Sequence, residues 1–314
     1  MTDQTDLLLV NQFHPETIAR LDEQYRTHKL WEADGRDKIG LINSLSGKCS
    51  AAASASWELD PVVYELESLQ FIAAFGVGVD GIDFDKTRAN GIRVSNTPDV
   101  LNDAVADLAL AMILAGSRNL INADAYARQG NWLQGPFPFG RSLQGKTLGI
   151  AGLGRIGKAV AERALPFGLN IAYHNRRQSE LDYSYHDSLE SLARASDILL
   201  GILPGGESTR GLFNRDIFQA LGPDGLFINI GRGSSVVEEE LAQSLAEKEI
   251  AAAALDVYEN EPRIPASLTR LDNIILLPHI GSATRETRRD MGQLVIDNLA
   301  AYFDGLPLLT EVSP

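Results

Sequence analysis

Cysteine is almost absent from this sequence, since Cys49 is the single one among 314 residues. An intramolecular disulfide is therefore excluded, and so few thiols in a chain of this length are typical of a reducing cytosol. Long hydrophobic runs are lacking too, because the longest apolar stretch, residues 108–116, is too short to span a bilayer. The N-terminal residues show no basic segment followed by an apolar core, so no signal peptide is expected. These absences predict a soluble, cytoplasmic protein.

Basic residues are in deficit, with 28 Lys and Arg against 42 Asp and Glu and a formal net charge of -14. A field of that sign repels nucleic-acid phosphates and anionic membrane surfaces, so neither is expected as a partner. An anionic small molecule would need a local basic site. No group of residues has the spacing of metal ligands, so no metal is expected.

The length exceeds what one hydrophobic core usually supports, which predicts two domains. Short apolar runs alternate with helical patterns, as in parallel sheets whose strands are joined by helices. In the first part of the chain we expect strands at 6–10, 49–54, 71–75 and 93–96 and helices at 15–25 and 34–45. These pieces make one small doubly wound α/β unit.

Residues 99–120 read as one long helix that Asp99 can cap. A stripe of mostly small residues along it would permit close packing, either within a domain or between subunits: Ala104, Leu108, Ala111, Met112 and Ala115. An ordinary core face is the plainer interpretation. Residues 131–142, rich in Gly, Pro and aromatics, are expected to form an exposed loop or arm.

A second unit begins with a predicted strand at 146–151, a GLGRIG turn, a helix at 158–167 that Gly168 can end, and a strand at 169–175. The turn contains Gly152, Gly154 and Gly157, and a strand–turn–helix context is what separates a dinucleotide site from a glycine-rich turn without a ligand. Gly152 allows the tight turn, Gly154 lets the backbone approach a pyrophosphate, and Gly157 lets the helix pack on the strand. The N–H groups of Arg155 and Ile156 would meet the phosphates at the positive helix end.

The tip of the following strand indicates the cofactor. An NAD site usually has a carboxylate there for the ribose hydroxyl, whereas this chain has Asn175, Arg176 and Arg177, with Glu180 only later. Arginine can bind a 2′-phosphate bidentately, which favours NADP(H). NAD(H) beside two solvated arginines remains the alternative.

Three later segments place polar residues just after predicted strands, where ligands bind in open α/β sheets. Arg232 follows a strand at 225–229, Glu261 follows an apolar run ending near residue 254, and His279 follows a strand at 273–277. Each alone would be read as a surface charge or a structural histidine. Together, beside a dinucleotide motif, they indicate catalysis.

Several motifs in this order strongly resemble the D-2-hydroxyacid dehydrogenase family, over nearly the whole chain. They are AAFGVGVDGID at 73–83, the helix entry at 96–110, GLGRIG, GRG, DVYENEP and PHIGSAT. Because of the two arginines after residue 175, the chain looks most like the glyoxylate/hydroxypyruvate reductases and related NADPH-linked 2-ketoacid reductases.

The resemblance implies two doubly wound parallel-sheet domains. A Rossmann cofactor domain at 99–285 would be inserted in a flavodoxin-like substrate domain, made of 1–98 and 286–314, with the substrate between the two. The loop at 55–57 would help to shape the substrate pocket. A homodimer is expected, with Trp132 either reaching the partner's active site or serving as a plain contact.

The resemblance also implies roles for single residues. His279 would donate a proton to the developing alkoxide, and Glu261 would orient its ring and favour imidazolium. Arg232 would contact the 2-oxo oxygen and the substrate carboxylate, which the amides of Val77 and Gly78 would also bind. The remaining residues would line the cofactor: Asp256 at the nicotinamide carboxamide, with Leu203, Pro204, Ile230 and Gly281.

The substrate stays open among glyoxylate, hydroxypyruvate, 2-ketogluconate and aryl pyruvates. A dinucleotide-sensing protein like the corepressors that share this fold is a rival of another class, which the acidic charge makes less fitting. A formate dehydrogenase would have glutamine beside its histidine where this chain has Glu261. A phosphoglycerate dehydrogenase often carries a regulatory domain, for which this chain ends too early.

Overall fold

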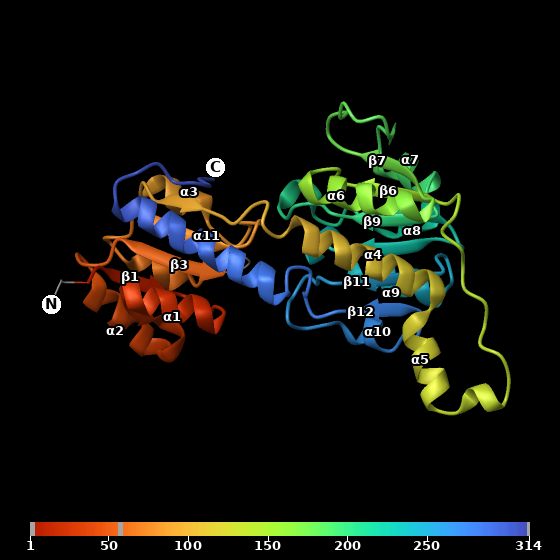
Figure 1. Cartoon of the computed structure of the whole chain (residues 1–314), viewed down its shortest axis with the longest axis horizontal. Helices are drawn as coiled ribbons and strands as arrows, with labels where there is room; N and C mark the ends of the chain where they lie inside the picture. The colour runs from red at the N-terminus through yellow and green to blue at the C-terminus, as the bar shows by residue number, and fades with distance from the viewer. Residues whose placement is uncertain (1–3, 56–58, 313–314) are drawn as a thin grey trace. The chain divides into compact units, whose positions relative to one another are not determined.

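The computed structural model describes residues 4–55 and 59–312. Ser56 and Trp57, predicted to help shape the substrate pocket, lie outside the described residues. The chain forms two compact units, residues 1–101 with 284–314 (unit 1) and residues 102–283 (unit 2). Both are α/β units (Figure 1), and the strands of each sheet pair in parallel.

Unit 1 contains a five-stranded sheet of order β2-β1-β3-β4-β5, which is the flavodoxin-like order. Every residue of β3 and β4 is buried, as expected for central strands covered on both faces. The strands are β1 (Asp6–Leu9), β2 (Arg26–Lys29), β3 (Ala51–Ala55), β4 (Phe71–Phe75) and β5 (Arg93–Ser95). The helices are α1 (Pro15–Gln24), α2 (Gly35–Leu45), α3 (Phe84–Ala89) and the C-terminal α11 (Arg285–Phe303).

Helix α11 is part of unit 1 because it packs along β4 and against α1. Tyr302, near its end, stacks on Phe71 of β4 with ring centroids 4.9 Å apart. At its beginning, Thr284 caps the helix by accepting a hydrogen bond from the N–H of Thr287. The first turn of α11 lies at the carboxyl end of β4, because the guanidinium carbon of Arg288 is 5.5 Å from the centroid of the Phe75 ring.

Unit 2 contains a seven-stranded sheet of order β12-β11-β10-β9-β6-β7-β8. Counted from its own first strand this is 7-6-5-4-1-2-3, the Rossmann order with one added strand, and the strand order reverses at β6. The strands are β6 (Thr147–Ala151), β7 (Asn170–His174), β8 (Ser184–Tyr185), β9 (Ile198–Gly201), β10 (Leu226–Asn229), β11 (Ala252–Leu255) and β12 (Ile274–Leu276). The helices are α4 (Asn102–Arg118), α5 (Leu120–Arg128), α6 (Arg155–Ala164), α7 (Leu189–Arg194), α8 (Arg215–Leu221), α9 (Glu238–Ala246) and α10 (Ala266–Thr269). The predicted fold class is confirmed.

The prediction of one long helix over residues 99–120 is wrong. Helix α4 begins at Asn102, three residues after Asp99, which has a left-handed φ of 69°. A second left-handed residue, Asn119 at φ 50°, separates α4 from α5. Of the small-residue stripe only Met112 is buried, so the stripe is not the core face within unit 2, and its packing between subunits stays a prediction. The face that packs on unit 2 is made by Val105, Ala106, Ala109, Leu110, Met112 and Ile113.

Helix α5 and residues 129–142, here called the arm, project from the body of unit 2 (Figure 1). Within the described residues no single helix is long and apolar enough to cross a membrane. Helices α4 and α5 together pass that test by length and composition only, and they meet at a bend of 59°.

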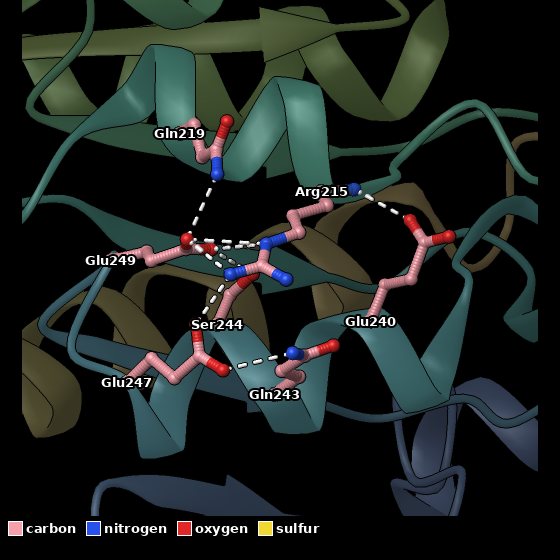
Figure 2. Close-up of polar contacts among 7 residues, drawn as sticks. All are labelled: Arg215, Gln219, Glu240, Gln243, Ser244, Glu247 and Glu249. Atoms are coloured by element: carbon pink, nitrogen blue, oxygen red, sulfur yellow. Dashed lines mark hydrogen bonds and ion pairs between the residues drawn. The ribbon is translucent and has the colours of Figure 1, made fainter.

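Helices α8 and α9 are joined by an ionic network around Arg215 (Figure 2). The Arg215 guanidinium donates to Glu249 from Nε, at 3.0 and 3.1 Å, and from Nη2, at 2.6 Å, and it also pairs with Glu247. Gln219 and Ser244 donate to the same Glu249 carboxylate at 2.8 and 2.9 Å. The bonds from Arg215 and Gln219 lower the pKa of Glu249 from 4.5 to about 2.

We expect Arg215→Ala to lower the melting temperature at pH 7 by a few degrees, because a bidentate network stabilises more than an isolated surface pair. The folded-state pKa of Glu249 lies below its unfolded value. Its contribution is therefore complete above about pH 5 and is lost as the pH falls towards 2. Melting curves from pH 7 to pH 3 should show the two proteins converging. Arg194→Ala, which breaks the exposed pair with Glu190, is the control and should change little. A difference in melting temperature between the two proteins that did not change with pH would contradict this role of the Glu249 charge.

Candidate active site

The predicted site residues of unit 2 follow six neighbouring strands at one edge of the sheet. Along that edge they are His279 after β12, Glu261 after β11, Arg232 after β10, Leu203 and Pro204 after β9, Gly152 to Gly157 after β6, and Asn175 to Arg177 after β7. Neighbouring strands lie about 4.8 Å apart, so the loops of Arg232 and Arg176 are separated by three spacings, roughly 14 Å. This row suits an elongated ligand whose reacting end lies near β10 to β12.

The turn between β6 and α6 packs closely on neighbouring backbone at Gly152 and Gly157, but it is open at Gly154. Gly152 has a φ of 105°, and a Cβ there would lie 2.6 Å from the carbonyl oxygen of Ile202. A Cβ on Gly157 would lie 2.5 Å from the carbonyl oxygen of Gly152. A Cβ on Gly154, in contrast, would meet no atom of the described residues within 4 Å. That open space faces the first turn of α6, which begins at Arg155 and Ile156, and it fits a pyrophosphate.

The tip of β7 contains the two arginines predicted to select the cofactor. Arg176 and Arg177 are exposed, and neither has a hydrogen bond or ion pair within the described part of the chain. Asn175 is turned back, because its Oδ1 accepts from the N–H of Leu153 at 2.7 Å and its Nδ2 donates to the Leu153 carbonyl at 3.4 Å. The tip therefore offers two guanidinium groups to a ligand phosphate, while Asn175 holds the glycine turn in place.

The loop of Arg232 is packed tightly on both sides. A Cβ on Gly231 would lie 2.6 Å from the Leu203 carbonyl oxygen, and one on Gly233 would lie 1.8 Å from the carbonyl carbon of Tyr258. The buried Asn229 braces the loop, because its Oδ1 accepts from the N–H of Gly231 at 3.1 Å and its Nδ2 donates to the Arg232 carbonyl at 3.0 Å. The arginine is thus fixed between the turn after β9 and the segment after β11.

The histidine and the glutamate are in direct contact. Nδ1 of His279 lies 2.7 Å from Oε2 of Glu261, and Oε1 of Glu261 accepts from the N–H of Tyr258 at 3.0 Å. His279 has a left-handed φ of 52°, an unusual conformation for a residue with a Cβ. Since the bond to Glu261 uses Nδ1, the proton that could pass to a substrate is the one on Nε2.

The pKa values of Glu261 and of the neighbouring Glu238 are shifted in opposite directions. Burial alone would raise the pKa of Glu261, but the hydrogen bonds from His279 and from the Tyr258 N–H, with the charge of Arg232, outweigh it and the pKa is lowered. Glu261 is therefore ionised at neutral pH. Burial raises the pKa of Glu238, whose Oε1 accepts from the N–H of Glu259 at 2.9 Å. Glu238 thus holds the segment that contains Glu261.

Asp256 lies behind the histidine turn. It is 1% exposed, and its two oxygens accept from the N–H groups of Ile280 and Gly281, each at 2.8 Å. Burial raises the pKa of Asp256, and these two bonds counteract the shift. Ile230 is buried as well, whereas Pro204 is exposed. The geometry of Asp256 gives it a structural task, which is to hold the turn after His279.

In unit 1 the loop after β4 contains Val77 and Gly78. The carbonyl of Gly76 accepts from the N–H of Thr97 at 2.9 Å, and the carbonyl of Val77 accepts from Nδ2 of Asn96 at 2.8 Å. In a trans peptide the N–H points opposite to the carbonyl, so the N–H groups of Val77 and Gly78 both point away from these partners. No acceptor for either lies among the described residues. Such a pair of amides can bind an anion.

Sequence reasoning missed three residues that support the site, namely Asn229, Glu238 and Tyr258. Asn229 could have been noticed as the polar end of an apolar strand followed by GRG. Tyr258 donates through its hydroxyl to the Leu277 carbonyl at 3.0 Å and so ties the segments after β11 and β12. Glu238 gives no sequence signal, because it is one of three consecutive glutamates and only the structure shows which one is buried.

Residues 110–281 match the family described as D-isomer specific 2-hydroxyacid dehydrogenase, NAD binding domain. The chain is 43% identical over 298 residues to a hydroxyphenylpyruvate reductase of Plectranthus scutellarioides, covering 93% of this chain and 94% of that protein. It is 42% identical over the same length, with the same coverage, to a glyoxylate/hydroxypyruvate reductase A of Arabidopsis thaliana.

A solved structure has the same fold over nearly the whole chain. It is an NADPH-dependent glyoxylate/hydroxypyruvate reductase from Sinorhizobium meliloti, in complex with NADP and malonate. The TM-score is 0.92 at 42% sequence identity, and the match covers 99% of this chain and 97% of that one.

Proposed function

Since the chain belongs to the D-isomer specific 2-hydroxyacid dehydrogenase family, and is therefore an oxidoreductase, we propose that it uses NADPH to reduce a small 2-oxo acid of the glyoxylate and hydroxypyruvate type to the D-2-hydroxy acid. The observation that carries this proposal is the contact between His279 and Glu261 at 2.7 Å, one strand from Arg232 on the edge that also holds the glycine turn. The names of the relatives and of the solved structure support it.

We assign each step of this reduction to particular residues of the chain. When bound, the cofactor supplies the hydride for the carbonyl carbon. His279 donates the proton from Nε2 to the oxygen on which charge develops, while Glu261 keeps Nδ1 protonated and the ring oriented. Arg232 polarises that oxygen and holds the substrate in position. The amides of Val77 and Gly78 bind the substrate carboxylate.

The cofactor preference rests on Arg176 and Arg177. Asp256, Leu203, Pro204, Ile230 and Gly281 are proposed to line the rest of the cofactor, with Asp256 acting chiefly through the turn that it holds. A charge-assisted contact between arginine and phosphate contributes roughly 1.5–3 kcal/mol, which corresponds to about 10–100-fold in affinity. We therefore expect NADPH to bind at least about tenfold more tightly than NADH at low salt.

We expect Arg176→Ala with Arg177→Ala to weaken NADPH about 10-fold or more and to leave NADH nearly unchanged. Asn175→Asp should go further, because Asp can still accept from the Leu153 N–H but its charge repels a 2′-phosphate. Dissociation constants of both cofactors, measured by fluorescence titration, provide the comparison. Arg194→Ala, a change of one exposed arginine in the same unit, is the control. Equal binding of both cofactors by the unaltered protein would contradict the preference for NADP(H), but it would not contradict dehydrogenase activity.

A substrate panel tests the reaction itself. Glyoxylate, hydroxypyruvate, 2-ketogluconate and an aryl pyruvate should be assayed with NADPH and with NADH. We expect the first two to have the highest kcat/KM. A best substrate among the last two would move the protein to another reductase of the same family. Cofactor binding without turnover of any 2-oxo acid would favour a dinucleotide-sensing protein.

We also propose a homodimer formed through α5 and the arm. Large apolar side chains are exposed there, with Trp132 at 74% and Leu133 at 94%, and a second copy would cover them. Light scattering should give twice 34.1 kDa, and Leu133→Glu with Phe139→Glu should shift the mass to that of one chain. Leu309→Glu, also exposed but in unit 1, should leave the mass unchanged. A monomeric unaltered protein would overturn the proposal.

A cytoplasmic location fits the one buried, unpaired thiol of Cys49 and the net charge of -14, which disfavours binding to nucleic acid or to anionic membranes. Cell fractionation tests the location. Recovery in a membrane or nucleoid fraction would contradict it.

A further inference from the structure

Arg288, in the first turn of α11, differs from the other arginines of unit 1. It is half-buried, and its guanidinium carbon lies 5.5 Å from the centroid of the Phe75 ring. No carboxylate of the described residues lies within ion-pairing distance of it, and no hydrogen bond to those residues is formed. Arg93, on the same sheet, is instead neutralised by Glu311 at 2.8 Å. A cation held out of water without a protein counter-ion costs stability.

The electrostatics agree with the geometry. Burial lowers the pKa of Arg288, and nothing offsets it, whereas the carboxylate partners of Arg93, Arg163 and Arg215 raise the pKa of those guanidinium groups. Arginine stays protonated in proteins, so the group is charged. Glu286 and Asp290 lie on the same helix but are exposed and do not pair with it.

The position of Arg288 points to an anionic ligand. Phe75 is the last residue of β4, and the carboxyl ends of parallel strands are where open α/β sheets bind ligands. Phe13 packs against the edge of the Phe75 ring at 5.5 Å, which fixes the ring that Arg288 covers. The amides of Val77 and Gly78 follow two and three residues later, with their N–H groups turned away from Thr97 and Asn96. The Arg288 guanidinium, from α11, and the two amides thus lie at the same end of β4.

We propose that Arg288 is a second cationic substrate-binding residue, whose guanidinium and the Val77 and Gly78 amides together bind the oxygens of a small organic carboxylate. This rests on the proposed function and deepens it, because it assigns carboxylate binding chiefly to unit 1. Arg232 is then available for the 2-oxo oxygen. The carboxylate is either the C1 group of any 2-oxo acid or a second acid group at the far end of a dicarboxylate.

The variants Arg288→Gln and Arg288→Lys test the proposal, with Arg289→Gln as the matched control, since that neighbour is exposed and has no partner among the described residues. Oxalate, a non-reacting dicarboxylate that mimics glyoxylate, is titrated calorimetrically into the NADP-loaded protein. We expect Arg288→Gln to weaken oxalate binding about 10–100-fold, Arg288→Lys to recover part of the loss, and the control to match the unaltered protein. Because the titration needs no turnover, its result does not depend on whether the protein catalyses the proposed reaction.

Kinetics distinguish the two sources of the carboxylate. If Arg288 binds the C1 group, KM rises about 10-fold or more for glyoxylate and for oxaloacetate alike, with a smaller change in kcat. If it binds a distal acid group, KM rises for oxaloacetate alone. Both patterns support the anion site, and an unchanged KM for both acids together with unchanged oxalate affinity would overturn it.

Thermal melting separates a binding role from a packing role. Removing an unpaired, half-buried charge should leave the melting temperature of the ligand-free protein unchanged or raised. If Arg288→Gln instead melted several degrees lower while oxalate still bound normally, Arg288 would be a structural cover for Phe75 and the proposal would be wrong.

Discussion

His279→Ala should lower kcat by about 10²–10⁴-fold while changing the dissociation constant of NADPH by less than about threefold. General-acid catalysis is typically worth that much, and the ring whose Nε2 would provide the proton is positioned through its Nδ1, which lies 2.7 Å from Glu261. The turn of His279 is held independently by Asp256 through the Ile280 and Gly281 amides. Loss of the imidazole should therefore remove the proton donor and leave the backbone in place. Steady-state kinetics and a cofactor titration on the same preparation measure the two quantities.

The control for this prediction is His28→Ala. His28 also lies 2.7 Å from a carboxylate, that of Asp6, but on the edge strand β2 of unit 1. Its removal should leave kcat within about twofold. A companion variant, Glu261→Gln, keeps a side chain that can bond to the ring but loses the negative charge beside it, so it should lower kcat less than His279→Ala does. Near-normal turnover of His279→Ala with a 2-oxo acid would sink the proton-donor assignment.

The fold could be predicted because buried parallel strands have a strong signature. The strand at 71–75 matches β4 throughout, and the glycine turn indicated both the strand before it and the helix after it. Strand β2, of sequence RTHK, was missed because it is a polar edge strand, with no fully buried residue. The break at Asn119 was missed for another reason. The apolar pattern continues across it, and one left-handed residue is enough to end α4.

The residues of the site could be predicted from the sequence, but the contacts that hold them in position could not. Gly233 was part of a motif, yet its close contact with the backbone of Tyr258 depends on how the segments after β10 and β11 meet. The buried state of Glu238, and the lack of a counter-ion for Arg288 among the described residues, likewise depend on neighbours that are distant in sequence. Periodicity and motif spacing describe one segment at a time, so they do not contain that information.

Arg232→Lys should lower kcat/KM by on the order of 10²-fold or more, although the charge is kept. Lysine loses the planar, bidentate guanidinium that suits a carbonyl oxygen with developing charge. The loop leaves little freedom to compensate, because Asn229 fixes the backbone on both sides and Gly231 and Gly233 are in close contact with Leu203 and Tyr258. A shorter reach cannot be recovered by moving the chain. If the contact is stronger in the transition state than with bound substrate, kcat should fall as well as KM rise.

The matched control is Arg210→Lys. Arg210 pairs at 2.7 Å with Glu259, which lies in the segment after β11. Both side chains are largely exposed, and a lysine at position 210 can keep the pair. We expect its kcat/KM to stay within about threefold, since an exposed pair contributes little. A loss in Arg232→Lys confined to KM would restrict the residue to holding the substrate carboxylate. It would then move polarisation of the 2-oxo oxygen to His279 alone. Kinetics like those of the unaltered protein with every 2-oxo acid would show that Arg232 contacts no substrate.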